Sequence, residues 1–206
     1  MTLDVAGVLR AARIVAVLTI HDASLAVPLA EALVAGGITT LEITLRTPAG
    51  RDAVAAIRRS VPAAMAGLGT VVTTEDLAIA ADLDLPFAFS PGATPALLAE
   101  AARRDIGFIP GIATASELMV AMAHGFSVVK LFPAVQVGGV AMLRALAGPF
   151  AQARFCPTGG VTPENAATFL AEPNVLAVGG SWLAPPKDQA AGAWAAITER
   201  ARLALA

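Results

Sequence analysis

Cysteine and histidine are both scarce in this sequence. Cys156 is the only cysteine, which excludes an intrachain disulfide and any metal site built from several cysteines. We interpret it as a small apolar core residue. The only histidines are His21 and His124, and two lone histidines do not make a metal site. The sequence therefore predicts a protein without a bound metal.

Long apolar runs and regions of one charge sign are also missing. No charge-free stretch reaches the roughly 18 residues that a membrane-spanning helix needs, although the mean hydropathy is +0.70. The formal net charge of −2 comes from residues scattered along the chain, so no basic stripe is available to neutralise a phosphate backbone. We expect neither a nucleic-acid partner nor a membrane. Residues 1–13 have a short amphipathic pattern without the apolar core of a secretion signal, which favours a cytoplasmic location.

Short apolar and β-branched runs alternate with longer helical patterns along the whole chain. Helix start signals, such as Thr47 before Pro48 and Thr162 before Pro163, support the helical segments. The predicted strands are residues 14–20, 39–45, 63–67, 87–89, 107–109, 127–131, 154–156 and 175–178. The predicted helices are residues 24–35, 48–59, 74–83, 95–104, 115–124, 139–147, 163–171 and 188–205.

Alternating strands and helices predict right-handed βαβ units and a parallel sheet. We expect residues 1–206 to form one α/β domain, an eight-stranded parallel (β/α)8 TIM barrel with a short N-terminal helix. An open, doubly wound sheet is the alternative. That fold usually carries a glycine-rich dinucleotide fingerprint after its first strand, whereas here the strand runs into Ile20-His21-Asp22. The pattern therefore favours the barrel.

Lys130 lies inside the apolar run Val128-Val129-Lys130-Leu131-Phe132. An unpaired ammonium would be costly to bury there, and desolvation favours the neutral amine, which is the form that attacks a carbonyl group. We interpret Lys130 as a nucleophile that forms a Schiff base with a 2-keto acid. The structural alternatives are a lysine that extends to the rim of the barrel and one that only pairs with Glu42.

Two further charged residues belong to the second predicted strand and its end. Glu42 and Thr44 share one face of that strand, which should be the barrel interior. A carboxylate there can move protons for a lysine-bound intermediate, although a structural ion pair with Lys130 or Arg46 is the alternative. Arg46 can bind a carboxylate or phosphate through its forked guanidinium, or be a solvated surface charge.

Two glycine-rich segments, Thr158-Gly159-Gly160 and Gly179-Gly180-Ser181, follow the last two predicted strands. Barrels of this kind frequently bind phosphate at this pair of strands, through backbone N–H groups and a helix N-terminus. Either segment alone is as typical of a turn, but together they indicate a phosphate-binding site.

Seven segments share their pattern with one known family. They are Leu41-Glu42-Ile43-Thr44-Leu45-Arg46-Thr47, Gly67-Leu68-Gly69-Thr70-Val71, Phe89-Ser90-Pro91-Gly92, Ile109-Pro110-Gly111, Val129-Lys130-Leu131-Phe132-Pro133, Phe155-Cys156-Pro157-Thr158-Gly159-Gly160-Val161 and Ala177-Val178-Gly179-Gly180-Ser181-Trp182. With them, nearly the whole chain resembles the 2-keto-3-deoxy-6-phosphogluconate (KDPG) and 4-hydroxy-2-oxoglutarate (KHG) aldolases. The resemblance implies a metal-independent, cofactor-free class I aldolase, a lyase that cleaves KDPG reversibly to pyruvate and glyceraldehyde 3-phosphate in the Entner-Doudoroff pathway. It also implies a homotrimer.

The resemblance further implies a role for each matching residue. Lys130 takes the Schiff-base role and Glu42 the acid/base role. The implied substrate-binding residues are Arg46, Thr70, Pro91, Phe132 and Thr158. The implied phosphate-binding residues are Gly159, Gly160, Gly180 and Ser181. Arg46 and Thr70 would hold the substrate carboxylate, and a threonine at position 158 goes with the gluconate substrate in this family.

Other specificities of the same machinery are the alternatives, namely cleavage of 2-keto-3-deoxy-6-phosphogalactonate or KHG. A barrel that binds a sugar phosphate without turning it over is the competitor from another class, and a buried amine beside a carboxylate argues against it. Two segments depart from the family pattern. They are residues 81–85, before the fourth predicted strand, and Gln136 to Gly138, where acidic or small residues are common.

Overall fold

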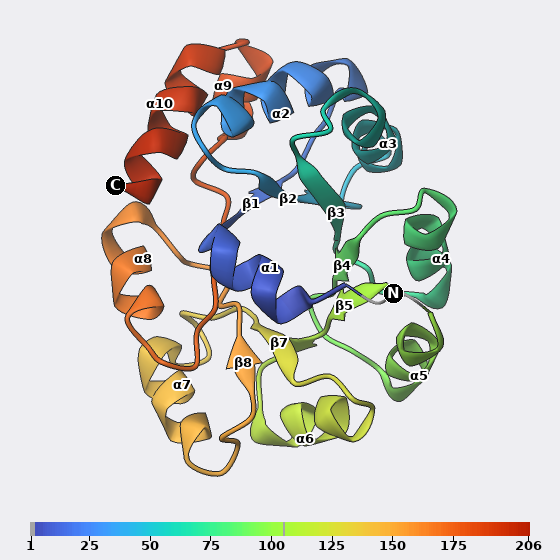
Figure 1. Ribbon diagram of the computed structural model, residues 1–206, viewed down its shortest axis with the longest axis vertical. Coiled ribbons are helices and arrows are strands. Elements are labelled where there is room, and N and C mark those ends of the chain that lie inside the picture. The colour runs from blue at the N-terminus through green and yellow to red at the C-terminus, as the bar shows by residue number, and fades with distance from the viewer. Residues whose placement is uncertain (1–2, 105) are drawn as a thin grey trace.

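Helices surround a central set of parallel strands in the computed structural model, which describes residues 3–104 and 106–206 (Figure 1). The strands are β1 (Ile14–Leu18), β2 (Thr40–Thr44), β3 (Met65–Gly69), β4 (Phe87–Phe89), β5 (Gly107–Ile109), β6 (Gly111–Ile112), β7 (Val128–Leu131), β8 (Arg154–Phe155) and β9 (Val178–Gly180). The helices are α1 (Val5–Ala12), the 3-10 helix η1 (Ala23–Leu25), α2 (Ala26–Ala35), α3 (Gly50–Ser60), α4 (Thr74–Asp82), α5 (Pro95–Arg103), α6 (Ala115–Ala123), α7 (Gly139–Ala147), α8 (Pro163–Leu170), α9 (Pro186–Ala190) and α10 (Trp194–Leu205).

The strands form two hydrogen-bonded sheets. The larger has six strands in the order β5-β4-β3-β2-β1-β9, and the smaller has three in the order β6-β7-β8. Neighbouring strands are parallel, as the alternation of strands and helices predicts. Glu42 of β2 is aligned with Val17 of β1 and Gly67 of β3, and Gly111 of β6 is aligned with Lys130 of β7.

The predicted closed eight-stranded barrel is wrong, because the strand ladder is interrupted in two places. Pro110 separates β5 from β6, and these two strands pair with different neighbours, β4 and β7. Pro157 follows β8, which has only two residues and meets the β9 segment through isolated bridges such as Thr158 to Gly179. Proline has no N–H to donate to a ladder, so each sheet ends at a proline. The doubly wound alternative is also wrong, since the strand order from β5 to β1 is sequential and does not reverse.

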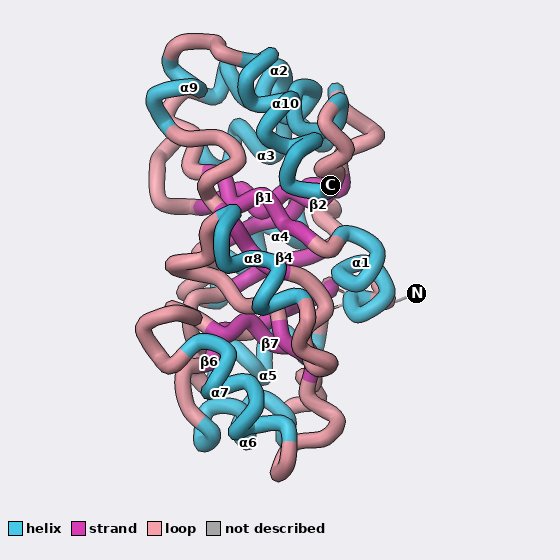
Figure 2. The backbone as a smooth tube through the Cα atoms, turned by 90° about the vertical axis from the view of Figure 1, so that its left-hand side faces the viewer, coloured by secondary structure: helices cyan, strands magenta, loops and turns pink. Residues whose placement is uncertain are grey.

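Two clusters of apolar side chains bury the two surfaces of the strands. The larger fills the layer between strands and helices. The smaller lies among the strands and consists of Leu9, Val15, Phe87, Phe89, Ile109, Cys156, Leu176 and Ala177. Leu9 reaches it from α1, which crosses one end of the strand assembly (Figures 1 and 2). Because β1 is buried along its whole length, its run of Ile, Val, Ala and Leu is typical of a parallel strand covered on both faces.

Threonine caps set the start of several helices soon after the preceding strand. Thr73 and Asp76 form a capping box at α4, and Thr94 and Thr114 accept hydrogen bonds from the first turns of α5 and α6. The loops before these helices are therefore short, and the residues that follow the strands are held close to the strand ends.

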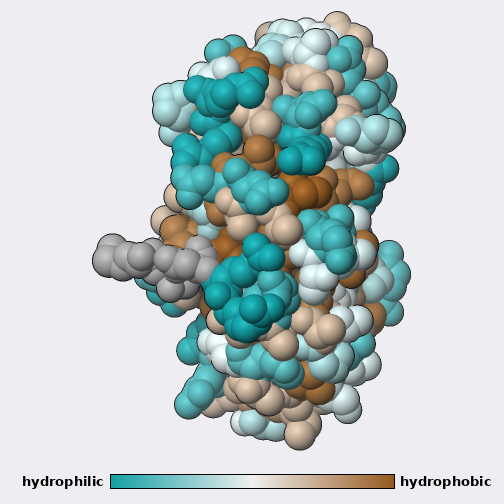
Figure 3. All heavy atoms as spheres, turned by 90° about the vertical axis from the view of Figure 1, so that its right-hand side faces the viewer, coloured by the Kyte–Doolittle hydropathy of each residue, from teal (hydrophilic) through white to brown (hydrophobic). Residues whose placement is uncertain are grey.

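The outer surface is mixed in character. On the face seen from the right-hand side of Figure 1, hydrophobic residues gather near the middle, with hydrophilic residues beside them (Figure 3). Among the described residues, no helix is both long enough and apolar enough to span a bilayer.

Candidate active site

Lys130 and Glu42 form a buried ion pair between β7 and β2. The Lys130 Nζ atom donates to both carboxylate oxygens of Glu42, at 2.8 Å and 3.1 Å. The Lys130 side chain is 2 % exposed and that of Glu42 is 0 % exposed. The structure thus brings together the two residues predicted to be catalytic, although they are 88 positions apart in sequence. The amine and the carboxylate are in direct contact, which is the geometry that a lysine nucleophile with its general base would require.

The space for the Glu42 carboxylate depends on a glycine in the neighbouring strand. A Cβ atom built on Gly69 would lie 2.3 Å from Glu42 Oε1, which is too close for any side chain at that position. The ammonium is also bordered by aromatic rings, with Nζ 5.3 Å from the ring centroid of Phe89 and 5.4 Å from that of Phe132. Both rings attract the cation and exclude water from it.

Arg46 and Thr70 lie side by side at the carboxyl ends of β2 and β3. The Arg46 Nε atom donates to Thr70 Oγ1 at 3.1 Å, and the backbone N–H of Leu45 donates to Gly69 O, which joins the two strand ends. Thr70 has a left-handed φ of 62°, which is uncommon for a β-branched residue, and strained backbone of this kind is enriched at functional sites. Arg46 is exposed, and among the described residues only its Nε is engaged, so its terminal nitrogens can reach a carboxylate.

Pro91 is held against the strand that neighbours Lys130. Ser90, which precedes it, is fully buried, and its Oγ accepts a hydrogen bond from the N–H of Gly111 at 3.1 Å. A Cβ atom built on Gly111 would lie 2.3 Å from the backbone of Pro91. Since Gly111 is aligned with Lys130 in the smaller sheet, Pro91 lies at the edge of the lysine site. This hydrogen bond also ties the two sheets together next to the interruption at Pro110.

The glycine-rich segments 158–160 and 179–181 meet at the carboxyl ends of β8 and β9. Thr158 is aligned with Gly179 in an isolated parallel bridge, and both Gly159 and Gly160 have left-handed φ values, 95° and 76°. Among the described residues, none accepts a hydrogen bond from the N–H groups of Gly159, Gly160 or Ser181. Adjacent unpaired N–H groups beside the N-terminus of α8 have the chemistry to bind an anion.

Three features of the site were not predicted as site residues from the sequence. Gly69 makes room for the carboxylate, Phe89 contacts the ammonium, and Ser90 links the two sheets. Strand alternation gave a signal for Phe89, since it shares the interior face with Phe87. Gly69 belongs to a segment that resembles the family, but its role was not predicted, because that role depends on the distance between β3 and the Glu42 side chain.

Cys156 lies in the interior cluster and is fully buried. Burial raises the pKa of its thiol to about 12. The side chain therefore stays a neutral thiol at ordinary pH, in agreement with the interpretation of Cys156 as a small apolar core residue.

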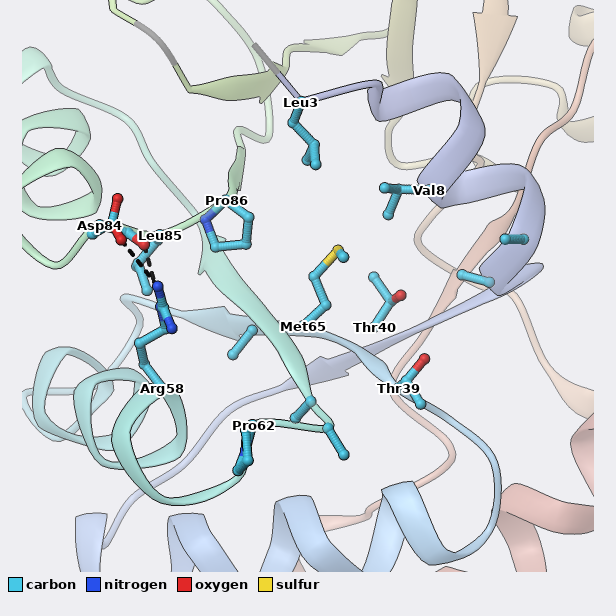
Figure 4. Close-up of a pocket in the computed structure, with 15 residues that line it drawn as sticks. Leu3, Val8, Thr39, Thr40, Arg58, Pro62, Met65, Asp84, Leu85 and Pro86 are labelled. Atoms are coloured by element: carbon cyan, nitrogen blue, oxygen red, sulfur yellow. Dashed lines mark hydrogen bonds and ion pairs between the residues drawn. The ribbon is translucent and has the colours of Figure 1, made fainter. Parts of the chain in front are cut away.

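A cavity of about 730 Å³ opens at the other end of the strands. It is lined by the amino ends of β2 and β3 and by α1, with Thr39, Thr40, Met65 and Val8 facing it and the Arg58–Asp84 ion pair at its rim (Figure 4). Neither Lys130 nor Glu42 lines this cavity. This cavity is therefore separate from the candidate active site, whose Arg46 and Thr70 follow the carboxyl ends of β2 and β3, where ligands of parallel α/β folds normally bind.

The fold and the site together define an α/β enzyme with a buried lysine–carboxylate pair. The family model for KDPG and KHG aldolases matches residues 5–200. The KHG/KDPG aldolase of Escherichia coli strain K12 is 47% identical over 199 residues, which cover 97% of this chain and 93% of that protein. The chain belongs to the KDPG and KHG aldolase family and is a lyase, which confirms the resemblance found in the sequence.

Two further relatives agree with this assignment. The 2-dehydro-3-deoxy-phosphogluconate aldolase of Pseudoalteromonas atlantica is 48% identical over 193 residues, which cover 94% of this chain and 90% of that one. The crystal structure of KDPG aldolase from Legionella pneumophila, with pyruvate captured as a covalent carbinolamine, matches with a TM-score of 0.93 at 41% identity and covers 96% of each chain.

Proposed function

We propose that this enzyme cleaves KDPG reversibly to pyruvate and glyceraldehyde 3-phosphate through a Schiff base on Lys130. The observation that carries the proposal is the contact of Lys130 Nζ with both oxygens of Glu42 in a buried site. A purely structural role does not readily explain this pair, because a buried ion pair often adds no net stability over apolar residues of similar volume. A lysine whose proton can pass to an adjacent carboxylate is poised to become a neutral nucleophile.

The reaction uses these two side chains and water. Glu42 takes a proton from the Lys130 ammonium, and the neutral amine attacks the C2 keto carbon of the substrate to give a carbinolamine. Loss of water, with a proton supplied by Glu42, gives the iminium. Glu42 then removes the proton of the C4 hydroxyl, the C3–C4 bond breaks, and its electrons move into the iminium to form the enamine of pyruvate. The released aldehyde is glyceraldehyde 3-phosphate.

The second half returns the enzyme to its first state. Glu42 gives its proton to C3 of the enamine, which becomes the iminium of pyruvate. Water adds to that iminium, its proton passes through Glu42 to the nitrogen, and the carbinolamine collapses to free pyruvate and the ammonium of Lys130 with which the cycle began. Because each proton that Glu42 takes is given back within one turnover, the cycle balances without a metal or a redox partner.

The remaining site residues hold the two ends of the substrate. Arg46 and Thr70 bind the carboxylate, Pro91 and Phe132 line the pocket around the keto group, and Thr158 faces the hydroxyl groups. The phosphate binds the unpaired N–H groups of Gly159, Gly160 and Ser181 together with the backbone of Gly180. Support comes from the contact between Arg46 and Thr70 and from the meeting of the two glycine-rich segments at one edge.

KHG is the second candidate substrate, because the Escherichia coli relative is a KHG/KDPG aldolase. Cleavage of KHG needs Lys130, Glu42 and Arg46 but not the phosphate site. The 6-phosphogalactonate epimer of KDPG differs from KDPG at a hydroxyl group near Thr158. These substrates are distinguished by activity and not by the fold.

Steady-state kinetics with KDPG, its galactonate epimer and KHG tests the proposal, with released pyruvate measured by reduction to lactate. We expect the highest kcat/KM for KDPG and no detectable cleavage by Lys130→Met. The matched control is Lys187→Met on α9, since Lys187 is the only other lysine and is exposed. Full activity of Lys130→Met, or an equal loss in both variants, would overturn the proposed mechanism.

We also propose that the enzyme is a cytoplasmic homotrimer. The family resemblance implies the trimer, and the hydrophobic residues gathered across one face offer a surface that association would bury (Figure 3). Light scattering coupled to size-exclusion chromatography measures the subunit number. A mass of one chain at micromolar concentration would contradict the trimer.

A further inference from the structure

The loop between β7 and α7 folds over the glycine-rich turn that follows β8. The backbone N–H of Ala134 donates to Thr158 O at 2.8 Å, and that of Val135 donates to Gly159 O at 3.1 Å. The loop is closed on itself by a hydrogen bond from Gly138 N to Val135 O at 3.3 Å. These bonds fix the position of Gln136, the residue between Val135 and the closing turn, relative to the backbone of the glycine-rich turn.

Gln136 extends its side-chain amide toward Gly160. A Cβ atom built on Gly160 would lie 3.6 Å from Gln136 Nε2, so the amide group is close to this glycine. Gln136 is exposed, and none of the described residues makes a hydrogen bond to its side chain. Among the described residues the two N–H donors of this amide have no protein partner, and they lie close to Gly160 of the glycine-rich turn.

We propose that Gln136 is a further substrate-binding residue, whose side-chain amide donates a hydrogen bond to the phosphate group of the substrate. The proposal rests on the assignment of segments 158–160 and 179–181 as the phosphate site. A neutral amide suits this place, because it donates to a phosphate dianion while the backbone N–H groups bind its other oxygens. Gln136 also lies in one of the two segments that the sequence analysis identified as departing from the family pattern.

Two substitutions at this position separate donation from simple occupancy of space. Gln136→Leu keeps the bulk of the side chain but removes the donor. Gln136→Glu places a negative charge near the phosphate and adds repulsion. Gln152→Leu is the matched control, because Gln152 is also exposed but precedes β8 and so lies at the amino end of the strands.

The measurement compares KDPG with unphosphorylated 2-keto-3-deoxygluconate in the wild type and in each variant. We expect Gln136→Leu to raise KM for KDPG by about three- to tenfold with little change in kcat, as loss of one partly exposed charge-assisted hydrogen bond does. Gln136→Glu should raise it further. The ratio of KM values for the two substrates should move toward one in both variants, and Gln152→Leu should leave that ratio at the wild-type value.

Inhibition by inorganic phosphate distinguishes a failure of the Gln136 role from a failure of the phosphate-site assignment. If phosphate inhibits the wild type competitively and the Gln136 variants equally well, the phosphate site stands and the role of Gln136 is refuted. If phosphate does not inhibit the wild type and the two substrates have equal KM values, the assignment of the phosphate site itself fails. A weaker inhibition of Gln136→Leu than of the wild type and Gln152→Leu supports the proposal.

Discussion

Removal of Lys130 alone should destabilise the folded protein, because it leaves the Glu42 carboxylate buried without a partner. Both oxygens of that carboxylate contact Lys130 Nζ, and the Glu42 side chain is 0 % exposed. Methionine is the appropriate replacement, since it keeps most of the length of the lysine side chain, whose Nζ lies near Phe89 and Phe132, while removing the charge.

The unpaired Glu42 carboxylate that remains in Lys130→Met determines how much stability is lost. Breaking a buried ion pair by removing one partner costs about 3–5 kcal/mol of the free energy of unfolding, because the remaining charge is uncompensated. The double variant Lys130→Met/Glu42→Gln leaves no buried charge, and it should recover a large part of that loss.

Urea unfolding of the wild type, the two single variants and the double variant measures these effects as a double-mutant cycle. We expect a coupling free energy of about 2–3 kcal/mol between positions 130 and 42 at pH 8. Additive losses, or a Lys130→Met variant as stable as the wild type, would refute the view that these side chains form a buried, mutually compensating pair.

Three other results follow from the geometry of the site. Gly69→Ala should displace the Glu42 carboxylate, since the added Cβ would lie 2.3 Å from Oε1, and kcat should fall by on the order of a hundredfold; retention of wild-type kcat would contradict this. Arg46→Gln should raise KM for KDPG and for pyruvate roughly tenfold or more, while KM for the aldehyde in the condensation direction should change little. Equal increases in KM for pyruvate and for the aldehyde would count against a contact between Arg46 and the carboxylate. Cys156 should resist alkylation in the folded protein at pH 8 and react once unfolded in urea, because burial holds the pKa of its thiol at about 12; rapid labelling of the folded protein would refute its burial.

The local pattern of the sequence predicts the elements well and their connections less well. The helix predicted at residues 139–147 is α7 as observed, and the strands predicted at 87–89 and 107–109 are β4 and β5. The last strand is shifted from 175–178 to Val178–Gly180, and the helix predicted at 188–205 is divided into α9 and α10. Glycine and proline positions explain such shifts, since apolar periodicity alone does not place the end of an element.

The prediction of a closed barrel was wrong because the local sequence pattern does not determine how neighbouring strands align. Whether a ladder continues past Pro110 or Pro157 depends on how neighbouring strands align, and alignment is a property of the assembled sheet. From the sequence, Lys130 and Glu42 each had a catalytic and a structural interpretation. The structure shows that the two side chains are in contact. Their catalytic roles, the phosphate assignment and the single-domain organisation stay predictions.

Trapping of the imine on its lysine tests the central claim most directly. The protein is treated with borohydride with and without pyruvate, its intact mass is measured, and any adduct is located by peptide mapping. The chain has two lysines, so the adduct must be assigned between Lys130 and the exposed Lys187. We predict a pyruvate-dependent mass gain of one reduced pyruvyl group, located on Lys130 and absent from Lys130→Met. Folded, wild-type protein that gains no mass, or gains it on Lys187, would contradict the Schiff-base mechanism.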